Sequence, residues 1–375
     1  MNKNKLNVIF VLLDGARWDR LHTSNDFQEI SKEGTMLNNV TTAMPYTVGS
    51  LNVTFSGLYG KDNGVDAYYN VLKLKEEITN LPIIFKKEGY FTACDLLHEK
   101  ILANRGFDIH QSHDEFSDDL EIKHKNLIKQ CLEKANGKPL FLFLYFSRLH
   151  TITVSDVLKK YEWNDKRFYN KKDENLKRYD NGFKEVGKYM RGLLYSLKKL
   201  KIYDDSIIIF FSDHGTGVGE RFGERNYGSF TYEETIRTFY LFISKDFKKG
   251  RISEKLRDTI DIFPTVLDLA KINNNLRRPG DSFAEFLLGN NNELKEKDYT
   301  FSETGALHGL YPSPDKSNVF CIKTPTQKLM YLDSPKQWKF FDLINDPNEM
   351  ENKYGSDLGT EKKLQKILNE FINNR

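Results

Sequence analysis

The chain has 375 residues, of which 39% are hydrophobic and 29% are charged, and its formal net charge is +3. This length and balance suit a folded α/β protein with one large domain and an appendage, or with two domains. The small charge excludes nucleic acid as the expected partner, and no apolar run reaches the roughly 20 residues that a membrane span needs.

The first apolar run, Leu6 to Leu13, indicates a buried strand rather than a signal peptide. It is short, it lacks a small-residue cleavage site, and Asp14 follows it directly. The three cysteines, Cys94, Cys131 and Cys321, are far apart and form no CxxC pair, which favours ordinary buried thiols in a reducing compartment. We therefore expect a cytoplasmic protein.

Apolar runs alternate along the chain with helical patterns. Helical stripes lie at 47–58, 122–132 and 183–200, and the strand-like runs are NVIFVLL (7–13), LFLFLYF (140–146), SIIIFF (206–211) and TFYLFIS (238–244). Their length and their content of Ile, Val, Leu and Phe suit strands that are buried on both faces. The alternation predicts an α/β fold with a doubly wound, mostly parallel sheet.

Two segments depart from this pattern. Residues 159–180 are charged and aromatic without clear periodicity, so we expect a solvated insertion near the active face, in the place of a lid. After the polar stretch GNNNELKEKD, short strand-like pieces precede the helical KKLQKILNEFI. We predict a catalytic α/β domain at 1–294 and, at 295–375, a small C-terminal α+β subdomain with a short antiparallel sheet and a terminal helix.

Polar side chains follow three of the predicted strands directly. Asp14 follows the first, the stretch SRLHT with His150 follows the second, and SDHG with Asp213 and His214 follows the third. Ligands bind outside the carboxyl ends of parallel strands, so these four side chains are expected at one edge. Asp14 also suits a turn and His150 a loop or core histidine, whereas the adjacent carboxylate and imidazole of Asp213 and His214 suit a shared cation.

Thr47 stands where a helical pattern begins, and Val-Gly-Ser follows it. It can be a helix cap. It can also be a nucleophile, because a hydroxyl needs a base or a metal to activate it, and Asp14, Asp213 and His214 can hold that metal. A helix N-terminus also suits an anionic ester. We expect Thr47 to be the nucleophile.

Six motifs, in this order, resemble the alkaline phosphatase superfamily, specifically its sulfatase-like branch. They are LLDGARWDRL, TVGSLNVTFSGLYGKDNGV, LHT, FFSDHG, DIFPTVLDLAKI and FFDLINDPNEMEN. The resemblance implies a metal held by Asp14, Thr47, Asp213 and His214, and it places the nucleophile, Thr47, nine residues before the Ser56-Gly57 pair. It implies one divalent cation, for which three oxygens and one imidazole suit Mn²⁺ or Zn²⁺ better than Ca²⁺, with Mg²⁺ and Ca²⁺ left open.

The resemblance also suggests roles for residues around the metal. His150 is the candidate general acid or ligand of a substrate oxygen, and His308 is a weaker one. Ser50 is expected to hydrogen-bond the anion, and Arg225 to add positive charge, although a solvated surface position also suits Arg225. The substrate is then an ester of a small molecule, a glycan or a lipid head group. The sequence does not disclose its identity or the oligomeric state.

The departures from the family pattern concern the nucleophile and the metal site. Sulfatases carry Cys or Ser in C/S-x-P-S-R, which is converted to formylglycine, whereas this chain has Thr47, Val48, Gly49, Ser50 and Leu51. Thr cannot become formylglycine. The second Asp of the sulfatase metal site is also replaced, by Gly15.

The metal-binding residues that remain, Asp14, Thr47, Asp213 and His214, resemble the single-metal site of phosphoglycerol and phosphoethanolamine transferases and of phosphodiester-cleaving relatives. We therefore expect a hydrolase or transferase that cleaves a phosphate mono- or diester or a phosphonate ester. The alternatives are a sulfuric ester hydrolase and a non-catalytic binding relative.

Overall fold

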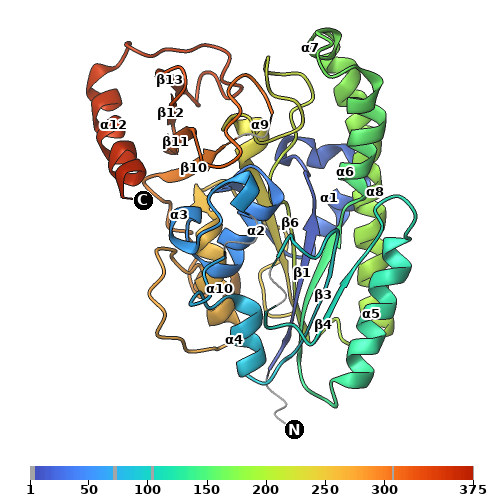
Figure 1. Cartoon of the computed structure of the whole chain (residues 1–375). Helices are drawn as coiled ribbons and strands as arrows, with labels where there is room; N and C mark the ends of the chain where they lie inside the picture. The colour runs from blue at the N-terminus through green and yellow to red at the C-terminus, as the bar shows by residue number, and fades with distance from the viewer. Residues whose placement is uncertain (1–4, 71–73, 103–104, 306–307, 375) are drawn as a thin grey trace.

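A nine-stranded mixed sheet forms the centre of the computed structural model, which describes residues 5–70, 74–102, 105–305 and 308–374 (Figure 1). Residues 1–4, with which the predicted catalytic domain begins, lie outside this range. The strand order is β4-β3-β5-β1-β6-β7-β2-β8, and β9 pairs with β2. In chain order the strands are β1 (Asn7–Leu13), β2 (Thr35–Thr41), β3 (Phe91–Leu96), β4 (Ile109–Ser112), β5 (Leu140–Phe146), β6 (Ser206–Phe211), β7 (Arg237–Ile243), β8 (Arg251–Ser253) and β9 (Arg257–Asp258).

All four predicted strands are confirmed, but one of them runs against its neighbours. β1 pairs in parallel with β5 and with β6, whereas β7 is antiparallel to both β6 and β2. Phe211 at the end of β6 lies opposite Tyr240 of β7, so the chain re-enters the sheet at the edge where it left. The connecting residues 212–236 therefore stay beside the carboxyl ends of the central strands.

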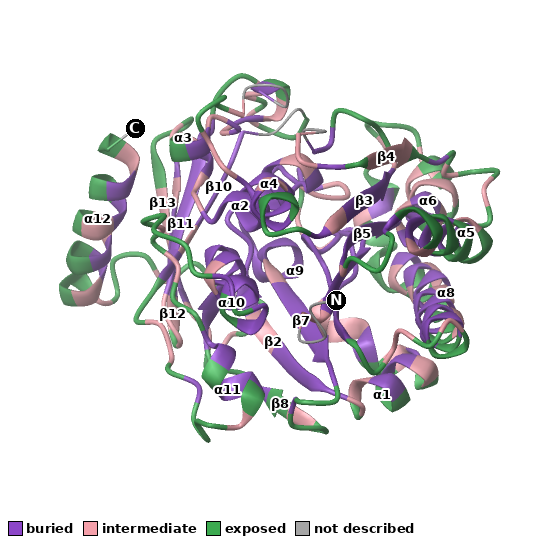
Figure 2. Cartoon of the chain, turned by 90° about the horizontal axis from the view of Figure 1, so that it is seen from below, coloured by how far each residue is buried: buried purple, intermediate pink, exposed green. Residues whose placement is uncertain are grey.

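Both faces of the sheet are covered, as a doubly wound fold requires (Figure 2). Alternate residues of β1 point to opposite faces, so Val8 and Phe10 belong to one apolar cluster and Ile9 and Val11 to the other. The first face carries α2 (Thr47–Ser56), α4 (Leu81–Lys87), α10 (Ile262–Leu269) and α11 (Ala284–Leu288), and the second carries α1 (Asn25–Ser31), α5 (Leu120–Lys134) and α8 (Lys172–Lys199).

The segment 159–180 is more ordered than expected, and the prediction of a solvated insertion is wrong for its second half. From Lys172 onward it forms the first turns of α8. The helical periodicity is not visible in the sequence because some buried positions of the helix are polar. The Asn175 side chain donates to the Phe168 carbonyl (2.9 Å), and the Tyr179 hydroxyl donates to the Gly15 carbonyl (2.8 Å). The remaining short helices are η1 (Trp18–Thr23), α3 (Gly60–Asn63), η2 (Tyr68–Asn70), α6 (Arg148–Ile152), η3 (Thr153–Val157), η4 (Leu158–Lys160), α7 (Arg167–Asn170), α9 (Glu233–Ile236) and η5 (Thr259–Asp261).

A second, antiparallel sheet with the order β10-β11-β12-β13 follows near the C-terminus. The helix α12 packs on one of its faces (Figure 1), and Phe230, Tyr232 and Ile236 pack on the other. The second sheet begins at Thr300, and a domain division at 295 stays a prediction. The elements are β10 (Thr300–Thr304), β11 (Val319–Lys323), β12 (Gln327–Leu332), β13 (Gln337–Asp342) and α12 (Leu358–Asn373).

Buried ion pairs join the two sheets. The Lys323 Nζ of β11 lies 2.7 Å from Glu233 Oε2, and the Lys328 Nζ of β12 lies 3.2 Å from Glu233 Oε1 and is also paired with Glu349. Glu233 begins α9, which leads directly into β7 of the main sheet. The second sheet is thereby attached to the connection that carries residues 212–236.

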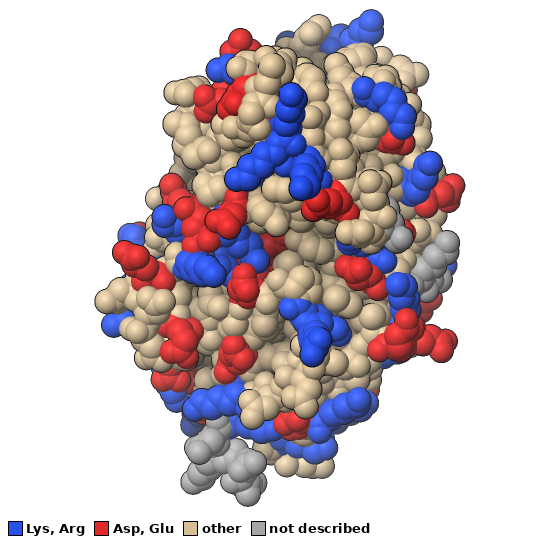
Figure 3. Space-filling model, turned by 90° about the vertical axis from the view of Figure 1, so that its left-hand side faces the viewer, with Lys and Arg blue, Asp and Glu red and all other residues tan. Residues whose placement is uncertain are grey.

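The surface beside this second sheet carries both signs of charge. Blue and red side chains are interspersed over the face shown in Figure 3. Among the described residues, no helix has both the length and the apolar character that a membrane crossing requires.

Candidate active site

The carboxyl ends of β1 and β6 bring Asp14 and Asp213 together. The two strands are parallel neighbours, and the Gly15 N–H donates to Asp213 Oδ1 (3.3 Å). Gly15 has φ = +67°, and a Cβ there would lie 2.8 Å from Thr216 Oγ1. A second Asp at this position would be strained and crowded, which accounts physically for the glycine.

Asp14, Asp213, His214 and Thr47 form one buried cluster, and His214 Nε2 lies at its centre. That nitrogen is 3.6 Å from Asp14 Oδ1, 3.3 Å from Asp213 Oδ2 and 3.2 Å from Thr47 Oγ1. The other ring nitrogen, Nδ1, lies 2.8 Å from the Gly215 carbonyl and must donate to it. In neutral His214, Nε2 therefore carries a lone pair that faces the cluster.

Two carboxylate oxygens of this cluster are buried without a hydrogen-bond partner among the described residues: Asp14 Oδ1 and Asp213 Oδ2. Burial, together with the like charge of Asp213, raises the pKa of Asp14 to about 7. Buried anions that lack partners are costly, and a divalent cation removes that cost. With the lone pair of His214 and the hydroxyl of Thr47, the donor set fits the predicted divalent metal.

Thr47 is the first residue of α2, and Tyr46 occupies the cap position without a side-chain cap bond. The first intrahelical bond runs from the Ser50 N–H to the Tyr46 carbonyl (3.0 Å). The Thr47 hydroxyl lies within hydrogen-bond distance of His214 Nε2. The interpretation of Thr47 as a helix cap is therefore wrong, and its hydroxyl is free to serve the cluster.

A pocket of about 140 Å³ opens over Asp14 and Thr47. Tyr145 donates its hydroxyl to Asp14 Oδ2 (2.7 Å), and the Tyr227 ring centre lies 4.2 Å from that of His214. None of the described residues that line the pocket is Lys or Arg. Its lining consists of Asp14, Tyr46, Thr47, Val48, Tyr68, Leu97, Ile101, Tyr145, His150 and Tyr227.

Neither tyrosine is among the site residues predicted from the sequence. A signal existed for Tyr145, whose hydroxyl is the only polar side-chain group in the run LFLFLYF and stands next to its carboxyl end. No sequence pattern marks Tyr227, because it belongs to the long connection 212–236 and does not follow a strand.

His150 lies beside Asp14 at the carboxyl edge of the main sheet, where it was expected. It is carried by α6, lines the pocket, and has its Nδ1 3.7 Å from Asp14 Oδ2. Burial lowers the pKa of His150, so its imidazole is neutral at neutral pH.

The three residues predicted to bind substrate do not join this cluster. Ser50 is buried with its hydroxyl donated to the Asp213 carbonyl (2.9 Å), so the proposal that it binds the anion is wrong. Arg225 lies beside a second pocket, and its guanidinium donates to the carbonyls of residues 158, 161, 162 and 163 at 2.6–2.8 Å. His308 lines the same second pocket, with its ring 4.6 Å from that of Trp163.

The chain matches known proteins over almost its whole length. It is 23% identical to an arylsulfatase of Clostridium perfringens over 99% of this chain and 95% of that protein. A 2-O GAG sulfatase structure superposes with a TM-score of 0.81 (16% identity, 99% of this chain, 92% of that chain). The phosphonate monoester hydrolase of Agrobacterium radiobacter superposes with a TM-score of 0.78 (13% identity, 99% and 96%).

Two family models match overlapping parts of the chain. Residues 223–374 match the family of the N-sulphoglucosamine sulphohydrolase C-terminal region. Residues 6–272, which contain Asp14, Thr47, His150, Asp213 and His214, match the sulfatase family. The chain therefore belongs to the sulfatase family.

Proposed function

We propose that this protein is a metal-dependent hydrolase of a sulfate monoester, with Thr47 as the nucleophile. The observation that carries the proposal is the pair of partnerless carboxylate oxygens, on Asp14 and Asp213, beside the hydroxyl of Thr47 and below an open pocket. Membership of the sulfatase family and the arylsulfatase relative support the sulfate ester. This places the family's sulfuric ester chemistry ahead of the phosphate ester expected from the sequence.

The charges of the site favour an ester with a single negative charge. Two ionised carboxylates, of Asp14 and Asp213, balance one divalent cation, and the described pocket lining adds no Lys or Arg. A sulfate monoester brings one negative charge, whereas a phosphate monoester brings about two at neutral pH. The second charge of the phosphate monoester would lack a counter-ion in a buried site.

Cleavage takes two steps, in which the Thr47 oxygen displaces the alcohol at sulfur and water then releases sulfate from Thr47. Asp14, Asp213 and His214 would hold the cation, which would lower the pKa of a neighbouring hydroxyl and neutralise charge on the transferring group. Thr47 presents its hydroxyl from the start of α2, where the first backbone N–H groups of a helix can orient an anion. Tyr145 fixes Asp14 by its hydrogen bond, and the N–H of neutral His150 can donate a hydrogen bond to the leaving oxygen.

The second pocket suits the alcohol part of the ester. It measures about 250 Å³ and shares one segment with the first: Tyr227 lines the first pocket, while Arg225 and Ser229 line the second. Trp163, with its ring against His308, offers an apolar surface there. An alcohol such as a sugar or another small ring can lie in this pocket while the ester group lies above Thr47.

A second candidate function is hydrolysis of a phosphodiester or phosphonate monoester. Thr47 is the observation that favours it, since Thr cannot become the formylglycine that sulfatases use. These phosphorus esters also carry one negative charge, so the charge argument admits them.

Initial rates on four nitrophenyl esters test the proposal. Nitrophenyl sulfate is expected to give the highest kcat/KM, followed by bis-nitrophenyl phosphate and nitrophenyl phenylphosphonate, with nitrophenyl phosphate last. A highest value for either phosphorus monoanion would favour the second candidate. A highest value for nitrophenyl phosphate would contradict the charge argument and both candidates.

A further inference from the structure

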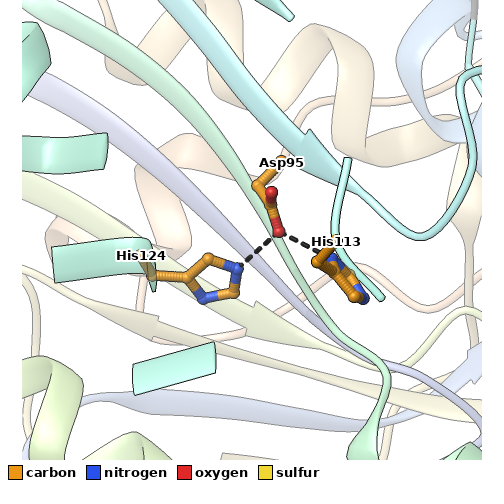
Figure 4. Close-up of side chains that lie close together, drawn as sticks. All are labelled: Asp95, His113 and His124. Atoms are coloured by element: carbon orange, nitrogen blue, oxygen red, sulfur yellow. Dashed lines mark hydrogen bonds and ion pairs between the residues drawn. The ribbon is translucent and has the colours of Figure 1, made fainter. Parts of the chain in front are cut away.

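A second group of one carboxylate and two imidazoles lies outside the candidate active site (Figure 4). Asp95 of β3 receives both rings on one oxygen: His113 Nδ1 lies 2.7 Å from its Oδ2, and His124 Nε2 lies 3.0 Å from it. The three side chains are buried. His113 follows β4 and His124 belongs to α5, so the group joins three elements.

Every ring nitrogen and carboxylate oxygen of this group has a partner. Asp95 can only accept, so both rings must donate to it. His113 Nε2 then accepts from the Ser147 hydroxyl (2.8 Å), and His124 Nδ1 accepts from the Tyr189 hydroxyl (2.6 Å). The other oxygen of Asp95 receives the Gln111 side chain (3.1 Å). These pairings need no metal, in contrast to the partnerless oxygens of Asp14 and Asp213.

The link from His113 to Ser147 leads to the helix that carries His150. Ser147 precedes α6, and a serine there ordinarily caps the helix. Its hydroxyl makes no cap bond in this protein because it is turned to His113. A second link runs from Thr151 of α6 to Glu115, 2.9 Å between Oγ1 and Oε2.

The N-terminal end of α6 is held by such external links. α6 (Arg148–Ile152) continues without a break into η3 and η4, and its first turn has no side-chain cap bond of its own. The segment 113–115 holds it at Ser147 and at Thr151. His150 lies between these two points, with Nδ1 3.7 Å from Asp14 Oδ2.

We propose that His113, oriented by Asp95, is a positioning residue that fixes α6 and so sets the place of His150 beside Asp14 and Thr47. The inference rests on the proposed function for its effect on turnover, because His150 must take part in the reaction. Its effect on α6 itself is independent of which ester is cleaved.

The chain contains a matched control. His124 shares the same Asp95 oxygen and is equally buried, but its other nitrogen bonds to Tyr189 of α8. Removing His124 therefore disturbs the same carboxylate without cutting the link to α6. A general loss of packing would appear in both variants, and a positioning effect only in the His113 variant.

The first measurement is hydrogen–deuterium exchange of the amides of residues 148–152. His113→Asn keeps a donor for Asp95 but does not reach Ser147, and Ser147→Ala cuts the same link from the other side. Each is expected to speed exchange about tenfold, the size that follows from one lost buried hydrogen bond, while His124→Ala leaves it near wild type. Equal acceleration by His124→Ala would overturn the inference.

The second measurement is turnover on the best of the four esters. His113→Asn and Ser147→Ala are expected to lower kcat with little change in KM, and to cause no further loss in a His150→Ala background. Full additivity with His150→Ala would overturn the link. A second metal ion per chain, lost in both histidine variants, would overturn it as well. Wild type inactive on all four esters would contradict the proposed function, while the exchange data would still decide the role of His113.

Discussion

The protein contains two buried groups of carboxylates and imidazoles. They differ in whether all of their polar atoms have hydrogen-bond partners. Around Asp14, Asp213 and His214, two carboxylate oxygens face a ring nitrogen and have no partner among the described residues. Around Asp95, His113 and His124, each polar atom is paired. Residue type alone does not separate a metal site from a hydrogen-bond network, but the number of unmet bonds does.

We call Asp14, Asp213 and His214 the open group, because it has carboxylate oxygens without partners in the described part of the chain, and Asp95, His113 and His124 the closed group. The largest expected effect comes from the open group. Thr47→Ala removes the hydroxyl beside His214 and is expected to lower kcat by several orders of magnitude in a folded protein, because the nucleophile is lost. Thr47→Ser keeps a hydroxyl and should retain measurable activity. Near-normal turnover by Thr47→Ala, with the fold checked by circular dichroism, would show that another group attacks.

Metal content separates the two groups next. Elemental analysis of purified protein is expected to find about one divalent ion per chain, and Asp213→Ala should lose nearly all of it because the metal loses a charged ligand. Asp95→Ala is the control, because the hydrogen bonds of Asp95 need no metal. Equal loss of metal from both variants would contradict the distinction between the two groups.

Asp95 of the closed group should make the stability of the protein depend on pH. Burial alone would raise the pKa of Asp95, but hydrogen bonds from His113 and His124 outweigh it and lower the pKa to about 2. Since the pKa of Asp95 in the folded protein lies below the usual value of 3.8, ionised Asp95 contributes about 2 kcal/mol of stability above pH 4, and this is lost as pH falls toward 2.

Urea unfolding of wild type and Asp95→Asn checks this at pH 6 and at pH 3. The difference in unfolding free energy should be larger at pH 6. A difference that grows toward pH 3 would mean that Asp95 is not held as an anion by its two histidines.

The smallest effect concerns the tyrosine beside the open group. Tyr145→Phe removes the donor to Asp14 Oδ2 and adds another partnerless oxygen. Partners of metal ligands contribute about 10–100-fold to affinity, so metal binding should weaken by about tenfold, which titration against a competing chelator can measure. Unchanged affinity would indicate that Asp14 is oriented by its backbone alone.

Much of the open group could be predicted because it follows strand ends. Parallel strands bring their carboxyl ends to one edge, so Asp14, Asp213 and His214 can be placed together from the sequence alone. The position of Thr47 at the start of a helical pattern makes it a candidate nucleophile.

Features that depend on the approach of distant chain segments could not be predicted. Whether Ser50 and Arg225 are available to a substrate depends on which carbonyls come near them, and hydrophobic periodicity carries no such information. The antiparallel direction of β7 and the pairing of His113 with Asp95 likewise depend on strand register.

The buried lysines of the second sheet have a consequence for how the chain can be divided. A chain that stops before Thr300 would leave Glu233 without Lys323 and Lys328 and would expose the apolar side chains around Ile236 to water. Each large apolar side chain exposed in this way costs about 1.5–3 kcal/mol, a large share of the stability of an ordinary domain. The C-terminal sheet is therefore not a detachable module: the two sheets should melt in a single cooperative transition, and a shortened catalytic fragment should aggregate rather than fold.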